Sequence, residues 1–115
     1  MPDKIEEVNA ELLMKIIQDD KFVTALFFDE TQLSNDVLTE LENIDDEADV
    51  FEIRFVRIND IKLAEDFSLV IIPSLVYFRH GIPIVYQVGF FQIDKKTKNK
   101  IVRIFFSKNV GRKNL

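Results

Sequence analysis

The chain has 115 residues, of which 47% are hydrophobic and 30% charged, a composition typical of one globular domain rather than a disordered protein. No run approaches the roughly 20 apolar residues of a membrane span, and the lack of cysteine excludes disulfides, thiolate metal sites and thiol catalysis. The net charge of −5 is uneven, because the segment from Lys95 onward holds eight bases and no acid, which leaves −13 for residues 1–94. Since so acidic a body repels nucleic acid, we expect no nucleic-acid partner.

The first part of the chain predicts an edge strand, a helix and a buried strand. Lys4 to Val8 has the pattern of a short edge strand, and Asn9 suits the N-cap of a helix that ends near Asp19. Four apolar residues are expected on one face of this helix: Leu12, Leu13, Ile16 and Ile17. The continuous apolar run from Phe22 to Phe28 is typical of a strand covered on both faces in a parallel sheet.

A second strand-loop-helix unit follows. The polar stretch 29–36 is rich in capping residues and opens a helix whose apolar residues recur every three or four positions: Val37, Leu38, Leu41 and Ile44. We expect an acidic loop at 45–49 and a third strand from Ile53 to Ile58. Asn59 and Asp60 then cap a short helix that turns Leu63, Ala64 and Phe67 inward.

The stretch from Val70 to Pro83 predicts a proline-led strand and a tight turn. Val70, Ile71 and Ile72 form a short apolar run that would place Pro73 at the edge of a buried core, as a candidate for a cis peptide. Pro73 is tolerated at the start of a strand, here Leu75 to Phe78. Gly81 supplies the positive φ of a tight turn, and the second hairpin arm runs from Pro83 to Val88.

The C-terminal segment is basic and has two interpretations. Asp94 would cap a final helix with Ile101, Ile104, Phe105 and Lys108 roughly in phase and Gly111 beyond its end. Alternatively, the usual final helix has been replaced by a variant tail. We therefore divide the chain into a domain at 1–89 and a basic segment at 90–115.

The residues around Pro73 resemble the signature of the thioredoxin family. In that family a hydrophobic residue, a cis-proline, a strand and a glycine turn follow one another, which here reads Ile72-Pro73-Ser74-Leu75-Val76-Tyr77-Phe78 with Arg79-His80-Gly81 as the turn. The resemblance covers residues 4 to about 89. It implies a thioredoxin-like α/β fold, in which helices flank a mixed central sheet and the cis-proline precedes an antiparallel hairpin.

The same resemblance implies that the redox site is missing. The family carries Cys-x-x-Cys where the central strand meets the second helix, and the two cysteine positions fall on Gln32 and Asn35, or on Thr31 and Ser34 if the alignment shifts by one. Amide and hydroxyl side chains cannot carry out disulfide exchange. The buried Asp of active members is matched by Leu26. We therefore expect a degenerate active-site loop, comprising Thr31, Gln32, Leu33, Ser34 and Asn35, and no enzymatic activity.

What the family retains without thiols is a peptide groove. The resemblance places this groove at Ile72, Pro73 and Ser74, where the backbone of Ile72 would pair with an extended peptide as a strand edge does. This predicts a redox-inactive binding or scaffold module, like the non-catalytic domains of protein disulfide isomerase relatives, with a protein or peptide client. It also admits an origin as one domain of a longer multidomain protein. The alternative is that Pro73 does no more than shape the core.

Two other functions remain open. One is a glutathione-binding, enzyme-like domain that would use the hydroxyl of Ser34. This alternative rests on the cis-proline, which glutathione transferases share. The other is a weak calcium-binding domain that uses the acidic stretch, although this stretch lacks the ligand spacing of an EF-hand. A solvated acidic face is the simpler interpretation. The acidic residues concerned are Glu40, Glu42, Asp45, Asp46, Glu47, Asp49 and Glu52.

No cofactor or metal site is predicted, because His80 is the only histidine and sits in a turn. The basic segment, with its interleaved phenylalanines, is a candidate for contact with an acidic partner or membrane surface. Residues 1–20 lack the features of a signal peptide. The chain as written therefore predicts a cytoplasmic protein, or one of the endoplasmic reticulum lumen if it is a fragment of a secretory-pathway protein.

Overall fold

The computed structural model describes residues 5–49, 51–88 and 97–106, with the side chains of 45–49 and 97–99 left out. In chain order the elements are β1 (Glu6–Val8), α1 (Ala10–Asp19), β2 (Phe22–Phe27), α2 (Gln32–Asp49), β3 (Ile53–Ile58), α3 (Ile61–Asp66), β4 (Ser74–Arg79), β5 (Ile82–Val88) and α4 (Thr97–Phe106). This order agrees with the predicted alternation of strands and helices.

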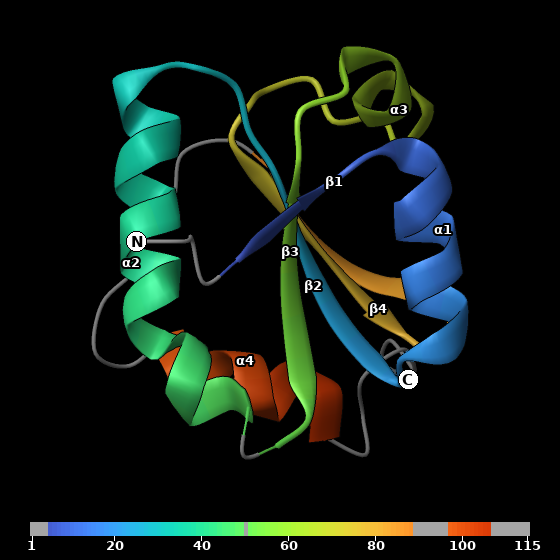
Figure 1. Cartoon of the computed structure of the whole chain (residues 1–115), viewed down its shortest axis with the longest axis vertical. Coiled ribbons are helices and arrows are strands. Elements are labelled where there is room, and N and C mark those ends of the chain that lie inside the picture. Colours follow the sequence, from blue (N-terminus) through green and yellow to red (C-terminus); the bar gives the residue numbers. More distant parts are fainter. Residues whose placement is uncertain (1–4, 50, 89–96, 107–115) are drawn as a thin grey trace, which may run out of the picture.

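The strands form one mixed sheet in the order β1-β3-β2-β4-β5. β1 and β2 run parallel to β3, whereas β4 pairs antiparallel with both β2 and β5. In Figure 1, α1 and α3 lie on one side of the sheet and α2 and α4 on the other. The structure is thus a three-layer α/β fold with β2 in its centre.

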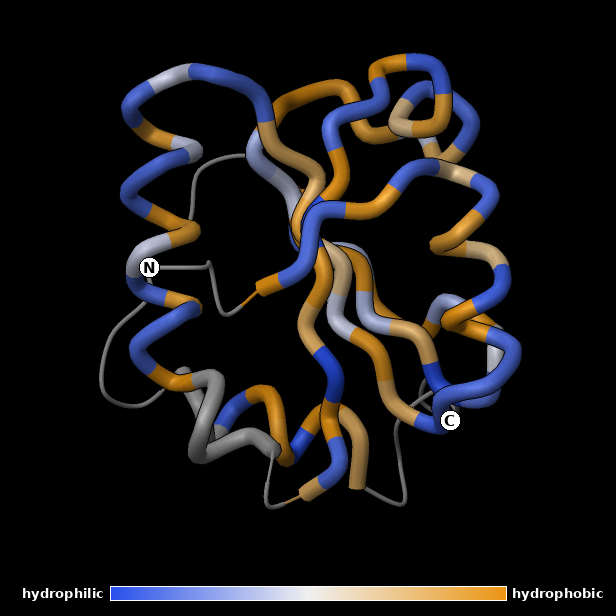
Figure 2. Tube along the Cα trace, in the orientation of Figure 1, coloured by the Kyte–Doolittle hydropathy of each residue, from blue (hydrophilic) through white to orange (hydrophobic). Residues whose placement is uncertain are grey.

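β2 supplies residues to two hydrophobic cores because its side chains alternate between the faces of the sheet. Phe22 and Leu26 belong to the core under α2 and α4, whereas Val23, Ala25 and Phe27 belong to the core under α1 and α3. All six residues of β2 are buried. Figure 2 shows hydrophobic residues along the central strands and hydrophilic ones on much of the helices.

Side-chain caps fix the starts of α1 and α3. Asn9 Oδ1 accepts a 2.8 Å hydrogen bond from the N–H of Leu12, and Asp60 Oδ1 accepts one of 2.9 Å from the N–H of Leu63. Both caps agree with the sequence prediction. Leu12 itself does not, because it is 37% exposed while Leu13, Ile16 and Ile17 are buried. Three residues at i, i+3 and i+4 already fill the face of α1 that meets the sheet.

The predicted acidic loop at 45–49 is wrong, since α2 continues to Asp49. No glycine or proline interrupts the sequence between Gln32 and Asp49, and acidic residues are compatible with helix when they face solvent. The spacing of Val37, Leu41 and Ile44, all buried, carries the helix into this stretch.

The β4–β5 connection is a two-residue hairpin turn. Arg79 pairs with Ile82, and the residues between them, His80 and Gly81, have φ of 53° and 81°. Positive φ at both central residues is the condition for a type I′ turn, whose twist matches that of the strands. A 2.9 Å hydrogen bond from the N–H of His80 to the carbonyl of Lys21 holds the turn against the residue that precedes β2.

α4 is part of the folded core. Ile101 and Phe105 are each 1% exposed and join the cluster under α2, where the Phe105 ring lies 5.2 Å from that of Phe22. The core therefore extends beyond residue 89. The predicted Asp94, Lys108 and Gly111 lie outside the described residues.

The polar side of α4 carries exposed Lys100 and Arg103. Attachment of the basic segment to an acidic surface stays a prediction. Among the helices of the described ranges, none combines the length and apolar character needed to cross a membrane.

The packing of α4 can be tested by truncating Phe105 to Ala. Loss of a fully buried phenylalanine should lower the free energy of unfolding by about 3–5 kcal/mol, measured by urea denaturation. Phe106→Ala is the matched control, because Phe106 is 50% exposed and should cost clearly less. Equal losses in the two variants would show that Phe105 is no more deeply packed than its neighbour.

Candidate functional site

The loop that joins β2 to α2 is held by hydrogen bonds to the Asp29 carboxylate. Asp29 Oδ1 accepts from the N–H of Thr31 at 3.1 Å, from Thr31 Oγ1 at 2.6 Å and from Ser34 Oγ at 2.9 Å. Ser34 Oγ in turn accepts from the N–H of Asp29 at 3.2 Å, and Thr31 Oγ1 from the N–H of Ser34 at 3.3 Å. The polar residues of this loop therefore serve to start α2.

These hydrogen bonds lower the pKa of Asp29 from its ordinary value. The bonds from the side chain and backbone of Thr31 contribute most, followed by that from Ser34, while burial acts weakly in the opposite direction. Each donor stabilises the charged carboxylate more than the protonated acid. Asp29 is therefore an anion throughout the physiological range.

The two predicted cysteine positions hold amides at the N-terminal end of α2. Gln32 is exposed, and its Nε2 donates to Asp36 Oδ1 at 2.8 Å; Asn35 is exposed too, and its N–H donates to the carbonyl of Thr31 at 3.1 Å. Leu33 is 38% exposed. Neither amide can take the place of a thiolate in disulfide exchange.

Ser34 is placed differently from what the glutathione alternative requires. The residue is only 1% exposed, and its hydroxyl both donates to Asp29 Oδ1 and accepts from the N–H of Asp29. A hydroxyl engaged in this way inside the protein is not presented to a thiol in solution. The geometry therefore favours a structural role for Ser34.

Leu26, at the position that the resemblance assigns to a buried Asp, is fully buried in an apolar cluster with Val37 and Leu75. One strand further, the Arg57 guanidinium lies over the Phe28 ring, 5.2 Å from its centroid, and its Nε donates to the carbonyl of Ile5 at 3.1 Å. The neighbourhood of the loop is thus an apolar core with a stacked cation at its edge.

The loop and the Pro73 segment meet at one end of the sheet. In the register of β2 and β4, Phe27 is paired with Ser74, which brings Ile72 beside Asp29. Phe28, Asp29 and Ile72 are among the residues that line a small cavity of about 30 Å³. The part of the loop that reaches the Pro73 segment is therefore its beginning at Asp29.

The Pro73 segment contains a residue, Ile72, whose backbone N–H and carbonyl find no backbone partner in the described ranges. The Ile72–Pro73 bond is cis, Pro73 is buried, and Ser74 Oγ donates to the carbonyl of Ile71 at 2.5 Å. β4 begins at Ser74, so Ile72 lies outside the strand. Among the backbone hydrogen bonds between described residues, none uses the N–H or the carbonyl of Ile72.

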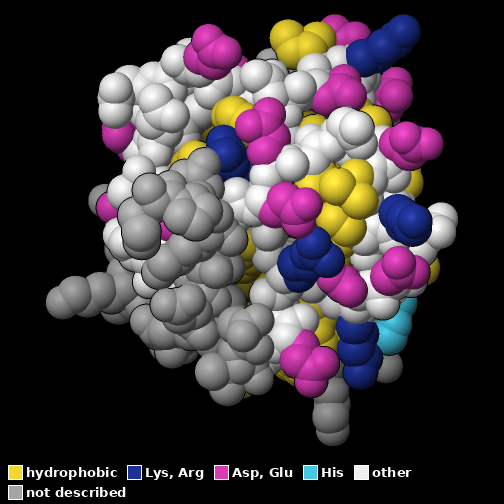
Figure 3. Space-filling view, in the orientation of Figure 1, with side chains coloured by type: hydrophobic (Ala, Val, Ile, Leu, Met, Phe, Trp, Pro, Cys, Tyr) yellow, Lys and Arg dark blue, Asp and Glu magenta, His cyan; other side chains and the backbone are white. Residues whose placement is uncertain are grey.

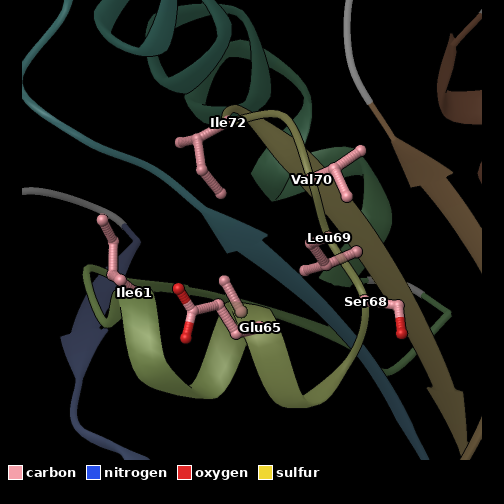
Figure 4. Close-up of a pocket in the computed structure, with 7 residues that line it drawn as sticks. Ile61, Glu65, Ser68, Leu69, Val70 and Ile72 are labelled. Carbon is pink, nitrogen blue, oxygen red and sulfur yellow. The ribbon is translucent and has the colours of Figure 1, made fainter.

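An open apolar groove of about 520 Å³ lies between α3 and the loop that leads to Pro73. Figure 4 shows Ile61 and Glu65 on α3, and Leu69, Val70 and Ile72 on the loop opposite. Ile61 is 69% exposed and Val70 84%. The groove thus has an unusual amount of aliphatic surface open to water.

Pro73 is buried, as expected for a proline at the edge of the core, but the apolar residues before it are not covered: Val70 is 84% and Ile71 53% exposed. Ser68, with φ of 61°, turns the chain after α3, and only Leu69 of the next residues is packed inside at 5% exposure. The sequence interpretation also missed Asp29, Asp60 and Ile61 as residues of the site. The signal for them was their position directly after β2 and β3, where the ends of neighbouring parallel strands meet.

No metal site emerges from the described residues. Among them no group of three or more His, Asp or Glu side chains is placed to hold a metal ion. Most of the acidic stretch on which the calcium alternative depends falls at 45–49, whose side chains lie outside the described set.

Neither a family model nor a curated protein sequence matches this chain. Solved structures do match its fold. A mutant thioredoxin from Halobacterium salinarum NRC-1 superposes with a TM-score of 0.74 at 21% identity, over 87% of this chain and 89% of that one. The thioredoxin of Fasciola hepatica gives 0.71 at 18% identity, over 86% and 98%.

Human ERp44 gives a TM-score of 0.74 at 19% identity, over 90% of this chain and 30% of that longer one. At such identities the similarity concerns the fold. The chain therefore has a thioredoxin-like α/β fold, and because its sequence contains no cysteine it cannot carry out the thiol-disulfide chemistry of thioredoxins.

The role of Ser34 can be tested by replacing it with Ala. The variant should raise the pKa of Asp29 toward its ordinary value, followed by NMR titration of the carboxyl carbon, and should lose about 1–2 kcal/mol of stability at neutral pH. Because the folded-state pKa of Asp29 is lowered, its contribution is present above the unfolded pKa of about 3.9 and disappears as the pH falls through the folded value. The difference from wild type should therefore shrink in acid.

Thr39→Ala, on the exposed face of the same helix, is the control and should leave the Asp29 titration unchanged. An unchanged pKa in Ser34→Ala would mean that the hydroxyl does not stabilise the Asp29 anion.

Proposed function

We propose that this chain is a redox-inactive thioredoxin-like binding module that holds an extended segment of a partner protein beside Pro73. The observation that carries the proposal is that the N–H and carbonyl of Ile72, at the end of the sheet next to an open groove, have no backbone partner within the described part of the chain. An extended peptide would donate to and accept from these two groups, as a strand does when it is added to a sheet.

The loop before α2 supports this proposal because its polar side chains hold it in place. Asp29 Oδ1 accepts hydrogen bonds from Thr31 and Ser34, which fixes the loop at the start of α2. A fixed loop beside the backbone of Ile72 favours recognition of a peptide over catalysis. The groove also limits the orientation of the bound segment, because α3 forms its second wall.

The proposal can be tested with a neutral peptide of sequence GSTVTVSG, titrated into the ¹⁵N-labelled protein. The largest amide shifts should occur at Ile72 and its neighbours. N-methylation of the peptide's central residues removes the backbone donors and should weaken binding about five- to tenfold, since each net hydrogen bond contributes about 1 kcal/mol. This comparison leaves the protein unaltered.

Pro73→Ala should reduce the shifts at Ile72 as well, provided that the variant gives a folded spectrum. Shifts confined to β1 or β5, the two edge strands of the sheet, would contradict binding at Ile72. Reduction of insulin by this chain alone would contradict the redox-inactive assignment.

A further inference from the structure

The apolar groove beside Ile72, of about 520 Å³, has room and surface for an aliphatic side chain. Its lining consists mainly of aliphatic groups, with Ile61 and Ala64 from α3 and Leu69, Val70 and Ile72 from the loop. Figure 4 shows the side chains of Ile61, Glu65 and Ile72 extending toward the space between α3 and the loop. Covering this aliphatic surface with a bulky aliphatic side chain would remove apolar area of both molecules from water.

The small cavity described above adjoins the groove, since Ile61 and Ile72 line both. Its polar lining includes two carboxylates, Asp29 and Asp60. Each uses Oδ1 for internal hydrogen bonds, Asp29 with Thr31 and Ser34, Asp60 with the N–H of Leu63. Among the described residues none donates to Oδ2 of either carboxylate.

Charge around the groove has one predominant sign. Glu65 lies in its lining and Asp66 follows on α3, against a single base on that helix, Lys62. Figure 3 shows acidic side chains bordering apolar surface at the top of the molecule, over α3. Residues 1–94 as a whole carry −13. A partner segment with positive charge is therefore attracted to this end of the sheet.

We propose that the groove recognises an extended partner segment in which a bulky aliphatic residue stands next to Lys or Arg. The aliphatic side chain occupies the groove between α3 and the Pro73 loop, and the cation lies against Asp29 and Asp60. This specificity rests on the proposed function, because the backbone of Ile72 holds the segment in place.

Three peptides that differ only at their central residues test the inference: GSKLKSG, GSELESG and GSKSKSG. Each is titrated into the ¹⁵N-labelled protein at low salt. GSKLKSG should bind at least tenfold more tightly than GSKSKSG, because a buried leucine side chain contributes at least one order of magnitude in affinity. It should also bind more tightly than GSELESG, whose glutamates are repelled by the carboxylates of Asp29, Asp60 and Glu65. Its amide shifts should include Ile61, Glu65 and Ile72.

Matched variants separate the two parts of the pocket. Ile61→Ser should weaken GSKLKSG about tenfold, whereas Ile82→Ser, at a similar exposure of 64% on the distant hairpin turn, should not. Asp60→Asn keeps a good N-cap and should reduce the preference for GSKLKSG over GSELESG several-fold. Asp19→Asn, at the end of α1, is its control.

The outcomes distinguish this inference from the proposed function. If all three peptides shift Ile72 with equal affinity, the aliphatic-basic specificity is overturned and binding at Ile72 stands. If GSKLKSG binds only through charge, GSKSKSG will match it, and the groove is not a side-chain pocket. If no peptide, including GSTVTVSG, shifts Ile72, the proposed function fails together with the specificity.

Discussion

The antiparallel register of β2 and β4 is the constraint on which the candidate site depends. Phe27 faces Ser74 across the two strands, so the loop that leaves β2 and the Pro73 segment that enters β4 meet at the same end of the sheet. A slip of one residue would exchange the two faces of β2, so that Phe22 and Leu26 would enter the core now filled by Val23, Ala25 and Phe27. The different packing of the two cores therefore fixes the site together with the fold.

Most of the fold could be predicted from the sequence because its signals are local. Short stretches of sequence predict the local structure directly, as in the apolar run of β2, the caps Asn9 and Asp60 and the turn at Gly81. The exposure of Val70 and Ile71 could not be predicted in this way. A run of aliphatic residues has the same pattern whether another layer covers it or not, and only the positions of α3 and the Pro73 loop decide this.

The candidate site was predictable in part for the same reason. Ile72 and Pro73 follow from a recognisable run of sequence, whereas Asp29 and Asp60 belong to it only because β2 and β3 are neighbours in space. The length of α2 was underestimated because acidity was taken as a loop signal, although no residue between Gln32 and Asp49 breaks a helix. An acidic composition indicates that a segment is exposed to solvent, but it does not distinguish a helix from a loop.

α4 closes a core that begins early in the chain. Ile101 and Phe105 complete the cluster under α2, where the Phe105 ring lies against those of Phe22 and Tyr77. Because Phe22 starts β2 and Phe105 lies near the end of α4, this side of the central strand stays partly uncovered until the chain has been synthesised through Phe105.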